Sequence, residues 1–238
     1  MTAVLFVALV LLMAVLVGLA LLRAGQSDVN SHQQWTYIGG FVVLYLAVPA
    51  VLATTGRLDR YDPMPAPALV MVPLLTLVTV RFATSSVGAR VGSSVGLATL
   101  VGFQVFRLPV EWLLHRLSVE QVIPQVMTYS GRNFDIVSGV TGGLLGVWLL
   151  RRSVPSWVLV IWNLTGLALL GNIVLVATLS TPALFRVFTE GPPNLLPSTF
   201  PFVWLPSFLV QLALVGHLLL FRCLRSGLAS INARPAIE

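Results

Sequence analysis

The most informative absence in this sequence is lysine, because all fourteen basic residues are arginine. A Schiff base with retinal or pyridoxal phosphate needs a lysine amine. A Walker A loop likewise needs a lysine that contacts the nucleotide phosphates. Both kinds of site are therefore excluded. The sequence also contains no Gly-x-Ser-x-Gly, no His-Glu-x-x-His and no aspartate-rich phosphate motif.

Charge of either sign is scarce. Only 9% of the 238 residues are charged, while 57% are hydrophobic, and a soluble domain carries about a quarter charged residues. Too few polar groups remain to cover the surface, so lipid must serve as the solvent. The net charge of +6 does not indicate nucleic-acid binding, because the arginines are scattered singly and form no patch. With Cys223 as the single cysteine, an intrachain disulfide bond is excluded.

Long apolar segments recur along the chain, and about 20 such residues suffice for an α-helix to cross a bilayer. We predict an all-α polytopic transmembrane bundle that forms one domain over residues 1–238, with a short tail at 222–238. The first segment lacks the basic region of a signal peptide, so we interpret it as a true span. The seven predicted spans cover residues 2–22, 35–53, 68–82, 91–114, 136–150, 157–179 and 202–221.

The placement of arginine predicts the orientation of the bundle. Eight arginines lie on the side of the loops that follow the first, third, fifth and seventh spans, and six lie on the opposite side. Because cytoplasmic loops are enriched in basic residues, we expect the N-terminus outside the cell and the C-terminus in the cytoplasm. The expected location is the bacterial inner membrane, where the lipid bilayer surrounds the protein as its main partner.

The fourth predicted span carries a polar stripe. Gln104, Arg107, Glu111 and His115 are spaced three, four and four residues apart, which places them on one face of a helix. A charge inside a span is unfavourable by at least a few kcal/mol unless it is paired. We therefore expect Arg107 and Glu111 to pair, directly or through one water. Pro109 should kink the helix between them, and a kink beside a polar face is typical of a cavity wall.

The polar loop after this span contributes further candidate residues. Arg132, Asn133 and Asp135 precede the fifth span, and either Asn133 or Asp135 could cap that helix. The loop is about twenty residues long, and loops of such length without regular structure are commonly functional. We therefore predict that Arg132 and Asp135 fold back toward Glu111 and His115 and share one pocket with them.

Other polar residues in the spans have simpler explanations. Asn163, Asn172 and Gln211 are predicted to form hydrogen bonds between helices, although such residues could also line a pathway. His217 is predicted to be a packed, hydrogen-bonded histidine near the inner face. The glycines within residues 139–146 follow the small-xxx-small spacing, which predicts close packing of the fifth span against a neighbouring helix.

Three segments in the second half of the chain belong together in our interpretation. They read Phe106-Arg107-x-x-Val110-Glu111-x-x-Leu114-His115, Met127-Thr-x-x-Gly131-Arg132-Asn133-Phe134-Asp135-Ile136, and Phe202-Val-Trp204-Leu-Pro206. In these segments the sequence resembles a group of uncharacterised bacterial multi-span integral membrane proteins. The resemblance implies no assigned function, but it implies that these residues act together.

Three functions fit these patterns. The leading hypothesis is binding or transport of a small polar or anionic solute in a pocket near the outer face. The first alternative is an intramembrane enzyme that uses Glu111 or His115 as general acid or base, and the second is a structural subunit whose charges only form a buried ion pair. No metal and no other cofactor is expected, since two potential ligands do not make a metal site. The candidate ligand-binding residues are Gln104, Arg107, Glu111, His115, Arg132, Asn133 and Asp135.

Overall fold

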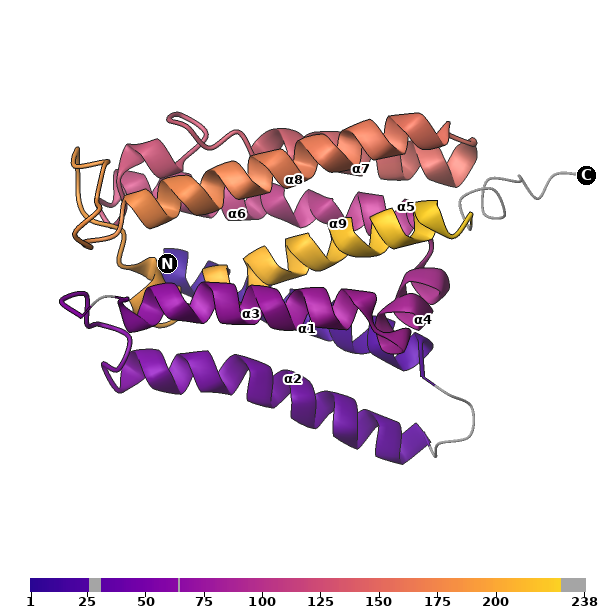
Figure 1. Ribbon diagram of the computed structural model, residues 1–238, viewed down its shortest axis with the longest axis horizontal. Helices are drawn as coiled ribbons and strands as arrows, with labels where there is room; N and C mark the ends of the chain where they lie inside the picture. The colour runs from indigo at the N-terminus through magenta and orange to yellow at the C-terminus, as the bar shows by residue number, and fades with distance from the viewer. Residues whose placement is uncertain (26–30, 64, 228–238) are drawn as a thin grey trace, which may run out of the picture.

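The computed structural model describes residues 1–25, 31–63 and 65–227 (Figure 1). In these ranges the regular structure is entirely helical, so the predicted all-α fold is confirmed. Length and composition qualify six helical segments to cross a membrane, and the protein is therefore membrane-embedded. The segments are Thr2–Arg23, Gln33–Thr54, Pro67–Thr84, Leu97–Val119, Ser156–Leu179 and Leu205–Arg225.

The long helices run back and forth along one axis (Figure 1). We use the term α4 end for the end that holds α4, the α7–α8 connection and the last turn of α9. The loop end is the opposite end, with the connections after α2, α6 and α8. In chain order the helices are α1 (Thr2–Arg23), α2 (Ser31–Thr54), α3 (Pro67–Thr84), α4 (Ser86–Val95), α5 (Leu97–Gly102), α6 (Arg107–Val119), α7 (Ile136–Arg151), α8 (Ser156–Leu179) and α9 (Val210–Arg225).

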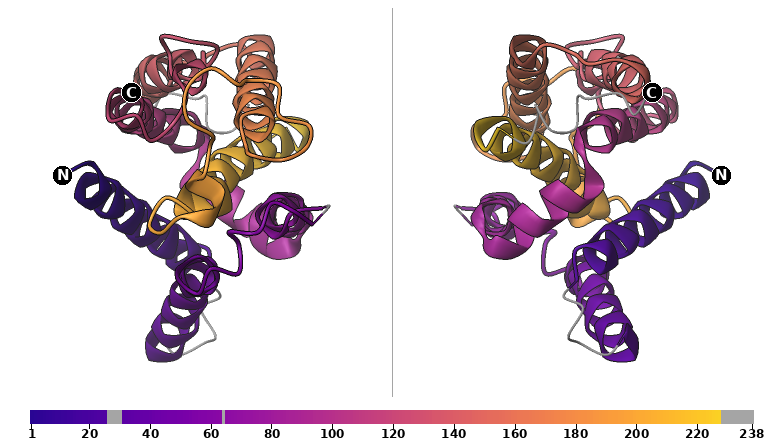
Figure 2. Two further views of the ribbon diagram at one scale, coloured as in Figure 1. Left: turned by 90° about the vertical axis from the view of Figure 1, so that its left-hand side faces the viewer. Right: turned by 90° about the vertical axis from the view of Figure 1, so that its right-hand side faces the viewer.

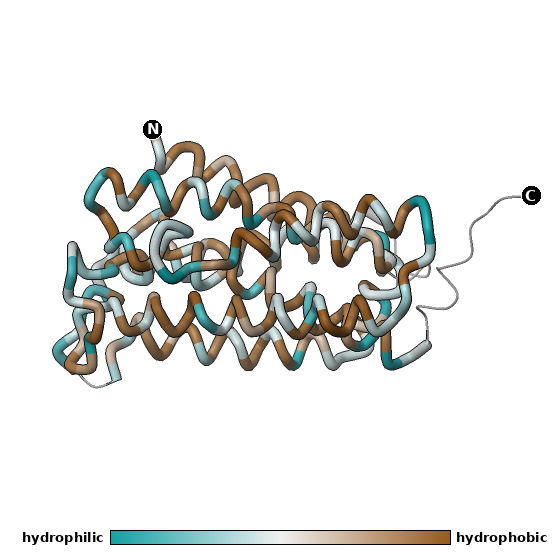
Figure 3. The backbone as a smooth tube through the Cα atoms, turned by 90° about the horizontal axis from the view of Figure 1, so that it is seen from above, coloured by the Kyte–Doolittle hydropathy of each residue, from teal (hydrophilic) through white to brown (hydrophobic). Residues whose placement is uncertain are grey.

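Helix α9 lies at the centre of the bundle and packs against α3, α4, α5 and α8. A π-helical turn at Leu205–Leu209 leads into it. Helices α1 and α2 pack on each other and project to one side (Figure 2). Hydrophobic residues cover most of the length of the helices, and hydrophilic residues gather mainly toward the two ends (Figure 3). This distribution is the one a bilayer requires.

The fourth span differs from its prediction of 91–114. Helix α4 ends at Val95, and the next residue is Gly96, whose φ of 79° lies in the left-handed region that favours glycine. The crossing segment begins only after this break and runs over Leu97–Val119 as α5, a 3₁₀ turn at Phe103–Phe106, and α6. Arg107 therefore lies near the middle of a 23-residue segment rather than in its outer part.

Helix α7 is the short member of the bundle, with 16 residues. It packs tightly on α5, as its glycines predict, because a Cβ atom on Gly146 would overlap the Cα of Gly102. A Cβ atom on Gly139 would lie 3.3 Å from the Cβ of Arg107. The first turn of α7 therefore lies beside the middle of the Leu97–Val119 segment, and α7 covers only the half of it near the α4 end.

The chain between α6 and α7 fills part of the remaining half. It folds back into the bundle instead of staying at its surface, because Ile123, Met127, Thr128 and Asn133 are all buried. Non-helical backbone at membrane depth is tolerated where protein surrounds it. We use the term fold-back segment for residues 120–135, which bring their polar side chains to the level of Arg107.

Candidate functional site

Arg107 is the centre of a buried polar cluster. Its side chain is 2% exposed, and its Nη1 atom donates to Oδ1 of Asp135 at 2.6 Å. Its Nη2 atom lies 3.2 Å from Nε2 of His217, and its buried Nε–H has no partner among the described residues. A direct bond between Arg107 and Glu111 is absent among the described residues, and Asp135 takes that place. Pairing of Arg107 with Glu111 through one water stays a prediction.

Asp135 reaches Arg107 from the end of the fold-back segment. It occupies the N-cap position of α7, but its side chain makes no capping hydrogen bond. The backbone N–H of Asp135 instead donates to Oδ1 of Asn133 at 3.1 Å, which holds the turn before the helix. The expectation of a side-chain cap at Asn133 or Asp135 is therefore corrected, and both side chains face the polar cluster.

Glu111 has a different environment from Asp135, although both carboxyl groups are buried. Both of its carboxylate oxygens lie 2.7 Å from Nδ2 of Asn133, which also donates to the carbonyl oxygen of Met127 at 3.1 Å. In the part of the chain that the structure describes, Glu111 has no ion pair with any basic side chain. It is a buried carboxyl group held by an amide alone.

His217 completes the cluster from α9, and its hydrogen bonds define its tautomer. A guanidinium group can only donate, so the His217 Nε2 that faces Arg107 must accept. The other ring nitrogen, Nδ1, lies 2.7 Å from Oδ1 of Asn163. The Nδ2 atom of the same amide donates to the His217 carbonyl oxygen at 3.1 Å, which fixes the orientation of the amide. His217 is therefore neutral and carries its proton on Nδ1.

From the sequence, His217 was expected to be a packed, hydrogen-bonded histidine near the inner face, and Asn163 was expected to bond between helices or to line a pathway. Hydrogen bonding of the histidine is confirmed, but its contact with Arg107 was missed. Gly166 makes room for the ring, since a Cβ atom there would overlap Cε1 of His217. The one available signal was that an ionisable residue inside a span is commonly functional.

Of the other two predicted interhelical hydrogen bonds, that of Gln211 is confirmed, whereas Asn172 bonds to a non-helical segment instead of a helix. Gln211 of α9 accepts a bond of 2.9 Å from the hydroxyl of Thr79 in α3. Asn172 of α8 donates to the carbonyl oxygen of Arg132 at 2.7 Å. This second bond attaches the fold-back segment to α8, and it helps to hold Asn133 and Asp135 against the middle of α6.

Three of the predicted site residues lie outside the Arg107 cluster or only beside it. The Nε2 atom of Gln104 donates to the carbonyl oxygen of Ala213 at 3.1 Å and thereby joins the 3₁₀ turn to α9. His115 stacks on Tyr129 with ring centroids 4.8 Å apart, and the guanidinium of Arg132 lies 5.4 Å from the ring centroid of Phe188.

His115 and Arg132 instead line a separate hollow of about 600 Å³. It is bounded by the last turn of α6, the fold-back segment and the connection after α8. The single shared pocket expected from the sequence is therefore divided. Asn133 and Asp135 converge with Arg107 and Glu111 in the buried cluster, whereas His115 and Arg132 lie in the hollow at the loop end.

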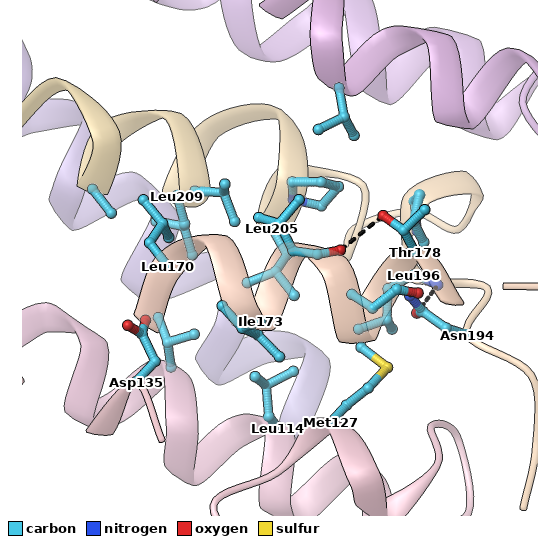
Figure 4. A pocket seen from close by; sticks show the side chains of 18 of the residues that line it. Leu114, Met127, Asp135, Leu170, Ile173, Thr178, Asn194, Leu196, Leu205 and Leu209 are labelled. Carbon is cyan, nitrogen blue, oxygen red and sulfur yellow. Dashed lines mark hydrogen bonds between the residues drawn. The ribbon is translucent and has the colours of Figure 1, made fainter. Parts of the chain in front are cut away.

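A cavity of about 80 Å³ lies beside the cluster. Arg107, Glu111 and Asp135 contribute its charged lining, and most of the remaining wall is apolar. In Figure 4, Asp135 lies at one end of the cavity and Thr178 and Asn194 lie toward the other. The apolar side chains between them come from α3, α6, α8, α9 and the π-helical turn, and they include Val72, Leu114, Leu170, Ile173, Leu205 and Leu209.

The short α7 explains why a cavity exists here. Near the α4 end, α7 packs on α5 and α5 packs on α9, so the space between these helices is closed. Toward the loop end α7 is absent. There the fold-back segment contributes Met127, and the connection after α8 contributes Leu196, to a wall that does not fill the space completely.

Comparisons with known proteins give no match: no family model, no curated protein sequence and no solved structure matches this chain. The evidence that the protein is membrane-embedded is therefore the length and composition of its apolar helices. The feature that bears on function is the cavity with its charged end.

Proposed function

We propose that this chain is an integral membrane protein of the bacterial inner membrane that binds or transports a small polar solute in the cavity beside Glu111. The observation that carries the proposal is the position of Glu111 on the wall of a mainly apolar cavity, where its buried carboxyl group has no basic partner among the described residues. Ionisable residues inside spans commonly mark the path of a solute or ion.

The size and lining of the cavity restrict the solute. A volume of about 80 Å³ is several times what one water molecule needs and lies below the range of drug-sized ligand sites. The wall favours a short apolar body, and Glu111 with the unpartnered Nε–H of Arg107 favours a polar group at one end. A solute with a few carbon atoms and one polar group fits both conditions.

The two alternative functions receive less support from this geometry. An intramembrane enzyme could use either Glu111 or His115 as general acid or base, but the two groups line different spaces and do not meet at one substrate. A purely structural role would account for the Arg107–Asp135 pair. It would not account for Glu111, whose buried carboxyl group has no basic partner among the described residues.

The proposal can be tested by filling the cavity. Ala177 of α8 lies on the cavity wall, whereas Ala168 of the same helix is exposed on the outside of the bundle. We expect Ala177→Phe to abolish binding of short four-carbon solutes and Ala168→Phe to leave it unchanged. The measurement is the rise in unfolding temperature of the purified protein in lipid nanodiscs, since a ligand that binds only the folded state stabilises it.

The solutes for this test are butylammonium, butan-1-ol and butanoate, so that all three charge types are represented. Stabilisation of wild type and Ala168→Phe by at least one of them, and not of Ala177→Phe, supports the proposal. Equal stabilisation of all three proteins would place binding elsewhere. If no solute stabilises wild type, the cavity does not bind molecules of this class.

A further inference from the structure

The charge balance of the cluster bears on the charge of the solute. Arg107 contributes one positive charge, and Asp135 compensates it at 2.6 Å. His217 is neutral, because its Nε2 accepts a hydrogen bond from the guanidinium. Glu111 therefore has no counter-charge of its own. An ionised Glu111 would leave the cluster with one uncompensated negative charge at membrane depth, which is strongly unfavourable.

We propose that Glu111 carries a proton in the ligand-free protein and exchanges that proton for the ammonium group of a small organic cation. This inference rests on the proposed function and adds the substrate class and the coupled ion. In the exchange, the Glu111 hydroxyl loses its proton to the aqueous phase, and the ammonium group donates a hydrogen bond to the resulting carboxylate. The total charge of the site is the same before and after the exchange.

Among the described residues around Glu111, Arg107 is the positive charge that would favour an ionised Glu111, and Asp135 compensates it. On α6 itself, Arg107 is paired, and His115 lies in the separate hollow. Helix α8 contains no titratable residue, and Arg81, the only one in α3, lies in the last turn at the α4 end. The fold-back segment contributes Asp135, and α9 contributes neutral His217.

An anion and a metal cation both fit the site less well. An anion would add a second negative charge to a site whose guanidinium is already compensated. A hard cation such as sodium or calcium needs several oxygen ligands, but the wall around Glu111 is mainly apolar. A protonated amine with a short apolar body needs only one carboxylate and an apolar surface.

The test compares Glu111→Gln with Glu190→Gln, which changes an exposed carboxylate in the connection after α8. We expect butylammonium to bind wild type and Glu190→Gln in nanodiscs with release of one proton, measured by calorimetry in buffers of different ionisation enthalpy. Glu111→Gln should release no proton and bind butylammonium about tenfold or more weakly, as expected on loss of one charge-assisted hydrogen bond. It should bind butan-1-ol as wild type does.

The wild-type protein provides a second measurement that does not depend on any variant. Because the proton competes with the ammonium group, butylammonium affinity should fall as the pH falls, while butan-1-ol affinity should stay constant. Binding of butylammonium without proton release, or tightest binding of butanoate, would overturn the inference and leave the proposed function intact. Failure of every solute to bind would overturn both.

Discussion

The two halves of the Leu97–Val119 segment are built on opposite principles. In the half near the α4 end, α5 packs on α7 through Gly102 and Gly146, and no side chain separates the two backbones. In the half near the loop end, α6 presents Arg107 and Glu111 to a buried polar cluster and a cavity. The difference lies in the length of α7, since the cavity is found where this helix is missing.

This comparison separates stability from binding. Small residues let helices approach closely, and the resulting contacts are a main source of association energy in membranes. A half closed by glycines leaves no space for a solute. The half that packs against the fold-back segment has less of this close packing, and its buried carboxyl group lies beside a cavity.

The largest expected effect concerns the half of the Leu97–Val119 segment near the loop end, which holds Arg107. Arg107→Met leaves Asp135 without its cation, and removal of one partner of a buried ion pair destabilises a protein by about 3–5 kcal/mol. The matched change is Arg116→Met on the same helix. Arg116 pairs with Glu120 at 3.7 Å, and both side chains are 40% exposed, so its loss should lower the free energy of unfolding by less than about 1 kcal/mol.

Both variants can be compared with wild type by denaturant titration in detergent micelles. The double variant Arg107→Met/Asp135→Asn should recover part of the stability, because it also removes the carboxylate that Arg107 compensates. Equal stabilities of Arg107→Met and Arg116→Met would contradict the buried ion pair as a stabilising contact.

A smaller effect is expected in the half near the α4 end, where α5 packs on α7 through glycines. A Cβ atom on Gly146 would overlap the Gly102 backbone, so Gly146→Ala forces α5 and α7 apart and should be destabilising by about 1–3 kcal/mol. Gly171 in α8 has no atom within 4 Å of the corresponding position, and Gly171→Ala should change the free energy of unfolding by about 0.5 kcal/mol or less. The same titration measures both variants. If Gly146→Ala has the same free energy of unfolding as wild type, the contact between α5 and α7 is not tight.

The prediction with the smallest effect on the protein concerns which end of the bundle, the α4 end or the loop end, faces the cytoplasm. In a chain with Cys223→Ala, a cysteine is introduced at Ser153, in the α7–α8 connection, or at Thr189, in the connection after α8. The arginine distribution predicts that Thr189→Cys reacts with a membrane-impermeant maleimide on intact cells and that Ser153→Cys reacts only after permeabilisation. The reverse pattern would invert the predicted orientation.

The long helices were predictable because their apolar runs are long. The span expected at residues 157–179 is α8, Ser156–Leu179, almost residue for residue. The break at Gly96 was missed, because residues 91–114 were predicted to form one continuous span. A left-handed glycine between two helices has no periodic signal, and the error moved Arg107 away from the middle of its segment.

The stripe of polar residues on α6 was also predictable, but its partners were not. Helical spacing brought Glu111 to attention as a partner of Arg107, since residues four apart lie on one face. The actual partners, Asp135 and His217, depend on the fold-back segment and on the position of α9. Pairings between residues so distant in the chain follow from tertiary packing, which helical spacing alone does not reveal.

The dependence of Arg107 on later parts of the chain has a consequence for biosynthesis. Among the six candidate spans, Leu97–Val119 has the lowest mean hydropathy, 1.3, so it is the segment that lipid accepts least readily. During translation it leaves the ribosome before Asp135 and well before His217. Until those residues are synthesised, Arg107 lacks both of the partners that it contacts in the folded protein. The final environment of Arg107 is therefore complete only after α9 has been synthesised.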